Sequence, residues 1–197
     1  MSRFLSTTHP LRAAAALLAA ATLAACADKA PTAPSAAPAA AWTTTSGSTL
    51  VSATTLRRTT ALRANVTRSV TLDRTGGKLA IPEAGLTIVI PANALPTSPM
   101  TITATAYAGT TVAYDFQPHG TRFLAPVRVQ QALSGTSWDG NTGRMQLEGG
   151  YYANDTQLDR VAGTAQLSEL FPVTLSGGVA SFTTPHFSGY IVATGRK

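Results

Sequence analysis

The chain has 197 residues, of which 44% are hydrophobic and 12% charged, a composition that supports one packed domain with tails. Thr, Val, Ala and Gly are abundant and long straight-chain helix formers are scarce, so we expect an all-β domain. The formal net charge is +6, but five arginines are concentrated in residues 57–74 without interleaved aromatic residues. This pattern argues against nucleic-acid binding, and we expect no nucleic-acid partner.

The N-terminal residues have the parts of a secretory signal. Residues 1–12 carry Arg3 and Arg12 and no acidic residue, and residues 13–25 form an apolar run of Ala and Leu interrupted only by Thr22. This run is shorter than the roughly 20 residues that a membrane-spanning helix needs. We therefore predict that residues 1–25 are a signal peptide and that the protein is exported.

The end of the apolar run, Leu23-Ala24-Ala25-Cys26, resembles the lipobox of bacterial lipoproteins. The resemblance implies that Cys26 becomes the first mature residue and carries diacylglycerol and an N-acyl chain such as palmitate. One acyl chain binds a membrane marginally, whereas two or more anchor it stably. We expect attachment to the inner or outer membrane of a bacterial envelope, facing the periplasm or the surface. The alternative is an ordinary cleaved signal in which Cys26 is incidental.

Two segments separate this anchor from the expected domain. Residues 26–50 are rich in Ala, Pro, Ser and Thr without an apolar period, which predicts a disordered tether after the lipidated cysteine. Residues 51–67 contain Thr runs that weaken a helix, so we predict an irregular or extended lead-in. Its Arg57, Arg58 and Arg63 are expected to face solvent or anionic headgroups. The folded domain is expected to span residues 68–197.

From Val70 onward, short apolar alternations recur between Gly and Pro turns. Residues 86–90 predict a buried strand, and residues 101–107 alternate cleanly between apolar and polar side chains. Residues 112–129 predict two strands joined by a corner at Pro118-His119-Gly120, which makes His119 a turn residue and neither a ligand nor a base. Short strands at such spacings are typical of an antiparallel β-sandwich.

Three segments, residues 76–82, 85–95 and 116–127, resemble the ZU-five domain, the β-sandwich shared by zona occludens proteins, netrin receptors and ankyrins. Residues 185–190 also look like the closing strand of that family. The resemblance implies a domain that mediates protein contacts and that is not an enzyme. Residues 134–178 match the family less well, and within them Leu167-Ser-Glu-Leu-Phe171 is compatible with a short helix.

The triplet His186-Phe187-Ser188 is the one chemically suggestive motif. Some relatives of the ZU-five domain cleave themselves at such a triplet, when the Ser hydroxyl attacks the preceding Phe carbonyl with the His as base. That reaction needs a strained peptide and a positioned base. The alternative, which we favour, is that His186 and Ser188 form hydrogen bonds at a corner of the sandwich while Phe187 packs inward.

Trp138, Tyr151 and Tyr152 lie in Gly-rich surroundings, where exposed rings can stack on sugars or on a protein. The alternative is that they cover an open end of the sandwich. We expect no cofactor and no metal, since the mature chain offers two histidines and a lipidated cysteine. Turn chemistry explains Asp139 and Asn141, and likewise the group Asn154, Asp155 and Asp159, better than a calcium loop does.

The leading hypothesis is a non-enzymatic, membrane-anchored envelope lipoprotein whose sandwich is an interaction or structural module, with an envelope protein as partner. The alternative is a carbohydrate- or peptidoglycan-binding module that uses Trp138, Tyr151 and Tyr152. A self-cleaving domain at His186-Phe187-Ser188 is a distant third.

Overall fold

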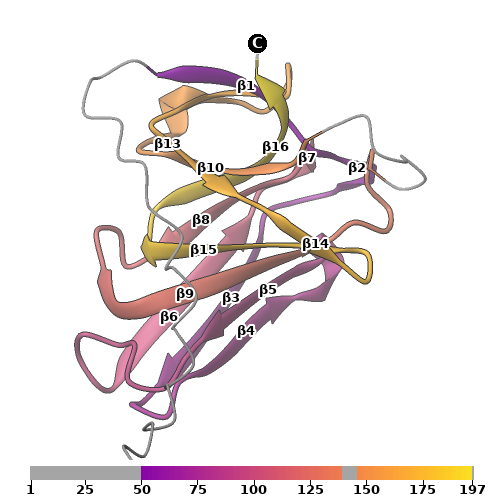
Figure 1. The fold of residues 1–197 in the computed structure, drawn as a ribbon. Coiled ribbons are helices and arrows are strands. Elements are labelled where there is room, and N and C mark those ends of the chain that lie inside the picture. Colours follow the sequence, from indigo (N-terminus) through magenta and orange to yellow (C-terminus); the bar gives the residue numbers. More distant parts are fainter. Residues whose placement is uncertain (1–49, 139–145, 197) are drawn as a thin grey trace, which may run out of the picture. The chain divides into compact units, whose positions relative to one another are not determined.

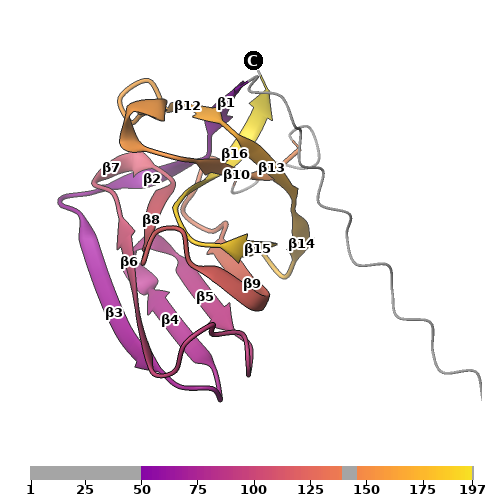
Figure 2. The same cartoon turned by 90° about the vertical axis from the view of Figure 1, so that its left-hand side faces the viewer.

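The computed structural model describes residues 50–138 and 146–196. These residues form antiparallel strands and two single-turn 3-10 helices, η1 (Pro82–Ala84) and η2 (Asp155–Gln157), so the expected all-β sandwich is confirmed (Figures 1 and 2). The predicted signal peptide, lipidated Cys26, tether residues before Leu50, and the pair Asp139 and Asn141 lie outside the described residues.

The larger sheet contains nine strands, seven of which follow one another across it. Two further strands extend from β16: β10 pairs with β16, and β13 pairs with β10. The seven, in spatial order, are β11 (Leu158–Asp159), β12 (Thr164–Leu167), β1 (Val51–Thr55), β16 (Gly189–Arg196), β8 (Ala113–Gln117), β6 (Met100–Ala106) and β3 (Val66–Leu72), and the two others are β10 (Glu148–Tyr152) and β13 (Glu169–Pro172).

The second sheet has five strands, and a separate pair joins β2 (Arg57–Leu62) to β7 (Gly109–Thr111). Neighbouring strands in both sheets are antiparallel. The five strands, in spatial order, are β14 (Thr174–Ser176), β15 (Val179–His186), β9 (Arg122–Ala132), β5 (Leu86–Ile90) and β4 (Gly77–Ile81).

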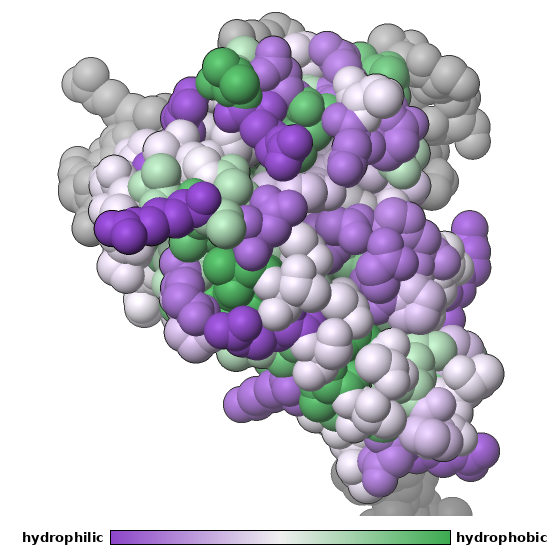
Figure 3. Space-filling view, turned by 180° about the vertical axis from the view of Figure 1, so that it is seen from behind, coloured by the Kyte–Doolittle hydropathy of each residue, from purple (hydrophilic) through white to green (hydrophobic). Residues whose placement is uncertain are grey.

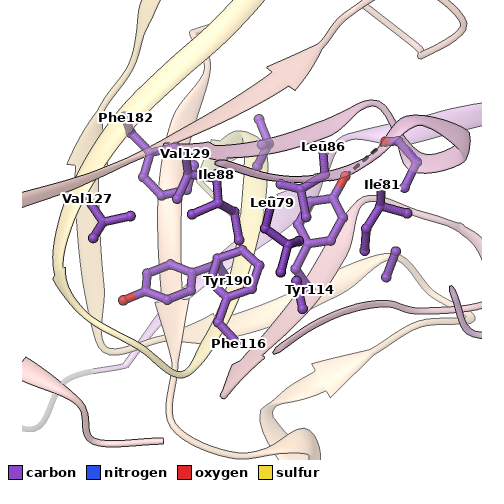
Figure 4. Close-up of a cluster of buried hydrophobic side chains, with 14 of the residues drawn as sticks. Leu79, Ile81, Leu86, Ile88, Tyr114, Phe116, Val127, Val129, Phe182 and Tyr190 are labelled. Atoms are coloured by element: carbon purple, nitrogen blue, oxygen red, sulfur yellow. Dashed lines mark hydrogen bonds between the residues drawn. The ribbon is translucent and has the colours of Figure 1, made fainter. Parts of the chain in front are cut away.

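The main core lies between the two sheets and follows from the alternation of side chains along each strand. On β5, Leu86, Ile88 and Ile90 point inward and are at most 2% exposed. Across from them, Phe116 of β8 and Tyr190 of β16 stack with ring centroids 5.3 Å apart (Figure 4). Each such buried side chain contributes about 1.5–3 kcal/mol to the free energy of unfolding, so this layer holds the sheets together.

The predicted corner after β8 carries the chain from one sheet to the other. β8 pairs with β6 and β16 in the larger sheet, whereas β9, which follows the corner, pairs with β5 and β15 in the second sheet. Thr121 at the corner donates its backbone N–H to the Pro118 carbonyl, 3.3 Å away. The two strands predicted in residues 112–129 are therefore present, and they belong to opposite layers of the sandwich.

Part of the larger sheet closes on itself at the end that is uppermost in Figure 1. β12 pairs with β1, β1 with β16, β16 with β10 and β10 with β13, while Ser168 alone separates β12 from β13. The resulting ring encloses a second, smaller core. Its buried members are four alanines and five larger side chains, namely Tyr107, Tyr152, Leu158, Leu167 and Ile191.

Strand β10 runs between the two cores, and its adjacent glycines meet one core each. A Cβ on Gly149 would lie 2.7 Å from Cγ of Phe182 in the main core. A Cβ on Gly150 would lie 2.6 Å from Cδ1 of Leu167 in the ring. Because successive residues of a strand face opposite sides, β10 has room only for a hydrogen atom on one face at Gly149 and on the other face at Gly150.

The expected lead-in of residues 51–67 is instead part of the folded domain. β1 lies between β12 and β16, Leu56 is fully buried, and β2 pairs with β7. Thr runs that disfavour a helix suit a pleated strand, which explains this outcome. Arg63 is exposed as expected, but the expectation that Arg58 faces solvent is wrong, because only 6% of Arg58 is exposed.

Residues 167–171, which are compatible in sequence with a short helix, are not helical. Leu167 ends β12, Glu169 begins β13, and Ser168 between them donates its N–H to the Tyr151 carbonyl at 2.9 Å. Leu170 packs on the ring core and Phe171 on the main core. A strand that contacts two cores on opposite faces gives the same apolar spacing as a short amphipathic helix.

Candidate functional site

Trp138, Tyr151 and Tyr152, whose rings could stack on a ligand if exposed, do not form one exposed surface. Tyr152 is 1% exposed, and its hydroxyl donates to the Tyr114 carbonyl at 2.9 Å. Tyr151, the preceding residue of β10, points to the opposite face and packs edge-on against His186, with ring centroids 4.8 Å apart. The expectation that both tyrosine rings are exposed together is therefore wrong, because alternation along β10 separates them.

Trp138 lies in the turn after β9 and is half-buried against the main core. Its backbone N–H donates to the Thr136 hydroxyl at 3.2 Å. This position agrees with the alternative that the aromatic residues cover an end of the sandwich.

His186-Phe187-Ser188 lies where β15 ends and β16 begins. Nδ1 of His186 is 3.1 Å from the Tyr190 hydroxyl, and Nε2 is 3.4 Å from a carboxylate oxygen of Glu169. Phe187 is fully buried, and its carbonyl accepts the Gly120 N–H at 3.1 Å. Both ring nitrogens of His186 therefore have partners other than Ser188, an arrangement that serves packing and hydrogen bonding at a sandwich corner.

A polar pocket on the outer face of the larger sheet is the best candidate site. It encloses about 330 Å³ between the end of β8, the corner that follows it, and the segment around η2. Elements far apart in the sequence supply its walls, and the buried ring of Tyr152 forms part of its lining. Its polar lining residues include Tyr107, Asp115, Gln117, His119 and Asp155.

One wall of this pocket is a cluster built by the corner after β8. Asp115 and Gln117 alternate outward on β8, and the corner returns His119 so that its Nε2 lies 2.5 Å from Oδ1 of Asp115. The Gln117 amide nitrogen donates to Oδ2 of Asp115 at 3.0 Å and lies 2.9 Å from Nε2 of His119. His119 is thus a turn residue as expected, and it also forms an ion pair when protonated.

The other wall joins Tyr107 to η2. The Tyr107 hydroxyl donates to Oδ1 of Asp155 at 2.7 Å. Burial, followed by the hydrogen bond and the negative charge of Asp155, raises the pKa of Tyr107 far above its ordinary value. Asn154 caps η2 through a capping box with Gln157, which fixes the backbone that carries Asp155. Tyr107 is therefore a neutral hydrogen-bond donor at neutral pH.

The arrangement suits the binding of polar groups. Carboxylate oxygens, an amide and an imidazole provide acceptors and donors around a half-enclosed space, and hydroxyl-rich or amide-rich ligands bind through such groups. Sequence reasoning missed this pocket because its parts come from residues 107, 115–119 and 152–155, which share no local motif. The only local signal is the i, i+4 spacing of Asp115 and His119 across a Pro-Gly turn.

The rest of the described surface offers no large apolar patch. Large exposed apolar side chains among the described residues are Leu50, Leu124, Val161 and Leu175, which lie on separate elements. On the face seen in Figure 3, hydrophilic and intermediate residues predominate and apolar ones form small separate patches. Within residues 50–138 and 146–196, no group of three or more His, Cys, Asp or Glu side chains is placed to hold a metal.

None of the helices in the described part of the chain is long and apolar enough to cross a bilayer. No protein-family model matches the chain, and no curated protein is detectably similar to it in sequence. The resemblance to the ZU-five domain stays a prediction.

Proposed function

We propose that the protein is a membrane-anchored lipoprotein of a bacterial envelope and that its β-sandwich is a non-enzymatic binding module. The observation that carries the anchor is the sequence Leu23-Ala24-Ala25-Cys26 at the end of an apolar run that follows two arginines. Such an anchor places a folded domain at a membrane without a spanning helix.

The anchor is tested by Cys26→Ala in the full-length chain. The variant is expected in the soluble fraction, because without acylation no long apolar segment remains after signal cleavage. Metabolic labelling with an alkyne-bearing palmitate analogue should mark the wild-type chain and not the variant. Pelleting of the variant with membranes to the same extent as the wild type would contradict the proposal.

What supports a binding role is the polar pocket at Asp115, His119 and Asp155, whose groups accept and donate hydrogen bonds. The resemblance to ZU-five domains favours a protein of the envelope as the partner. A photo-crosslinking residue at exposed Ala153, on the rim of the pocket, should capture that partner in intact cells. The same residue at exposed Leu175 on β14, in the other sheet, is the matched control. Equal capture from both positions would argue against the pocket.

A glycan, such as peptidoglycan, is the second candidate ligand, and one observation favours it. The pocket presents carboxylate, amide and imidazole groups together with tyrosine side chains, a combination that suits sugar hydroxyls. Binding on a glycan array should then fall at least about tenfold in Asp115→Asn, while Trp138→Ala binds like the wild type. Loss of binding in Trp138→Ala but not in Asp115→Asn would place the glycan site at Trp138, which is the position that the sequence alone suggested.

A further inference from the structure

Arg58 is a buried cation without an acidic partner. It is 6% exposed, and the three ion pairs among the described residues involve other side chains. Its Nη1 donates to the Thr111 carbonyl at 2.6 Å, and Nη2 lies 3.4 Å from the Tyr114 hydroxyl. Its Nε is buried and has no hydrogen-bond partner. Nη1 and Nη2 each carry two N–H groups and have one partner each, so the guanidinium has donors left over besides Nε.

Such an arrangement is costly unless another group completes it. A buried charge destabilises the fold by several kcal/mol when it is unpaired, and an arginine does not escape this cost by losing its proton. The face of the Tyr114 ring, whose centroid is 5.7 Å from Cζ of Arg58, offsets only part of the charge. The Thr111 carbonyl and the Tyr114 hydroxyl are neutral, so they do not balance the positive charge of Arg58 as a carboxylate would.

A pocket of about 270 Å³ opens directly beside Arg58. Arg58 forms part of its wall, together with η1, the end of β9 and the turn that follows. The lining hydroxyls of Thr59 and Thr136 already donate to backbone carbonyls at 3.0 and 2.6 Å. Arg58 is therefore the cationic donor among the residues that line the space. The pocket is distinct from the polar pocket at Asp115, with which it shares no lining residue.

A buried network holds the floor of the pocket in place. The Tyr114 hydroxyl lies 3.0 Å from the Ala84 carbonyl and contacts the side-chain oxygen of Gln131. The Gln131 amide nitrogen in turn donates to the Ala84 and Ala132 carbonyls at 3.1 and 2.8 Å. Arg58 therefore lies against a floor whose own polar groups are already paired, while its Nε is not.

We propose that this pocket binds a carboxylate group, which forms an ion pair with Arg58. A guanidinium matches a carboxylate in shape, since both are planar and can form two parallel hydrogen bonds. The charges in the pocket favour a monoanion over a phosphate dianion: Arg58 supplies one positive charge, and the rim carboxylate of Glu83 is paired with Arg68 at 2.9 Å. This site goes beyond the proposed function, and it does not depend on the anchor or on the polar pocket.

The first test observes the guanidinium itself. Sodium acetate is added at constant ionic strength to the full-length chain in detergent, and arginine Nε–H signals are followed by proton–nitrogen NMR. One signal, missing from Arg58→Lys, should shift saturably with acetate and not with chloride. The Arg58 signal staying in place up to about 0.1 M acetate, where a millimolar site is saturated, overturns the proposal.

The second test uses thermal unfolding. A ligand that binds only the folded state raises Tm, on the order of 5 °C at a hundredfold excess over Kd. Acetate should raise Tm of the wild type and of the exposed-site control Arg63→Met, but not of Arg58→Met. An equal rise in Arg58→Met overturns the proposal. Should Arg58→Met fail to fold, Arg58→Lys is measured instead. Lysine keeps the positive charge but lacks the two parallel N–H donors of the guanidinium, so the Kd for acetate should rise at least about tenfold.

The carboxylate could belong to an acidic side chain of a partner protein or to a small free acid. Two blocked tripeptides, Gly-Asp-Gly and Gly-Asn-Gly, distinguish these two sources. Binding of the Asp peptide as tight as that of acetate, with none of the Asn peptide, identifies an acidic side chain of a partner protein. Binding of acetate without the Asp peptide identifies a small free acid. Equal binding of the Asp and Asn peptides would show that the site does not distinguish a carboxylate from an amide, and this result overturns the proposal.

Discussion

The ring of Tyr152 covers Gly189 so closely that a Cβ on Gly189 would lie 2.2 Å from Cε2 of the ring. The ring cannot easily move aside, because it is 1% exposed and its hydroxyl is bonded to the Tyr114 carbonyl. Tyr152 and Gly189 also both line the polar pocket. This contact therefore links the start of β16 to the wall of the candidate site.

Gly189→Ala is expected to lower the free energy of unfolding by about 1–3 kcal/mol, since the added methyl group must displace a packed ring. Gly195→Ala is the matched control on the same strand, because a Cβ there has no neighbour within 4 Å. The control should be neutral or slightly stabilising. Urea unfolding of the two variants compares them, and equal midpoints would show that the ring yields without cost.

Stability should fall steeply at alkaline pH. Burial raises the pKa of Tyr114 to about 12 despite the opposing charge of Arg58, and burial raises the pKa of Tyr107, Tyr152 and Tyr190 as well. Below about pH 10 these phenols are protonated in both states. Above it the unfolded chain loses protons first, so the free energy of unfolding decreases as the pH rises toward 12 and beyond.

Phenolate absorbance and circular dichroism, recorded together during an alkaline titration, check this expectation. The absorbance of the four buried tyrosines should rise only as the strand signal is lost. In Tyr114→Phe, one such group is removed, so stability should decline less per pH unit. Ionisation of all four near pH 10 with an intact strand signal would refute the prediction.

The peptide between Phe187 and Ser188 should remain unbroken. Both nitrogens of His186 are near Tyr190 and Glu169, and neither Phe187 nor Ser188 has a positive φ. The intact mass of the purified chain should therefore include residues 188–197, and the mass of Ser188→Ala should be lower by one oxygen atom. A wild-type mass that lacks residues 188–197 would show that the motif is active.

His119→Ala should weaken ligand binding at the polar pocket while it leaves the stability of the fold nearly unchanged. The side chains of His119 and Asp115 are 49% and 19% exposed, so loss of their pair should change the free energy of unfolding by less than about 1 kcal/mol. The same variant should weaken binding at the polar pocket, because Asp115 loses the group that orients it. His119→Gln, which keeps a hydrogen-bond donor, should retain more binding than His119→Ala. If both His119 variants bind the ligand as tightly as the wild type does, the ligand binds outside the polar pocket.

Sequence patterns predicted the sandwich where alternation was strong and turns were marked by Gly and Pro. Residues 86–90 form β5, residues 101–107 overlap β6, and the corner at Pro118 joins the two layers. Strands were missed where a segment contacts two cores, as in β13, or buries few side chains, as in residues 57–62, because their burial does not alternate simply. Period-based reasoning depends on one buried face, and these segments do not have it.

The candidate sites were less predictable for a different reason. Asp115 and Asp155 face one pocket only because β8 and η2 are brought together by pairing between β10 and β16. The buried position of Arg58 depends on Thr111 and Tyr114, which lie more than fifty residues further along the chain. Neither relation leaves a signal in local spacing.

The pairing of the first strand with the last one constrains how the protein acquires its structure. β1 begins at Val51, and its partner β16 ends at Arg196, so the two edges of this contact are separated by almost the whole described chain. Such non-local pairs must wait for closure of a long loop, which slows folding to milliseconds or longer. The larger sheet cannot be completed before the eight residues of β16 have been synthesised and are free to pair with β1.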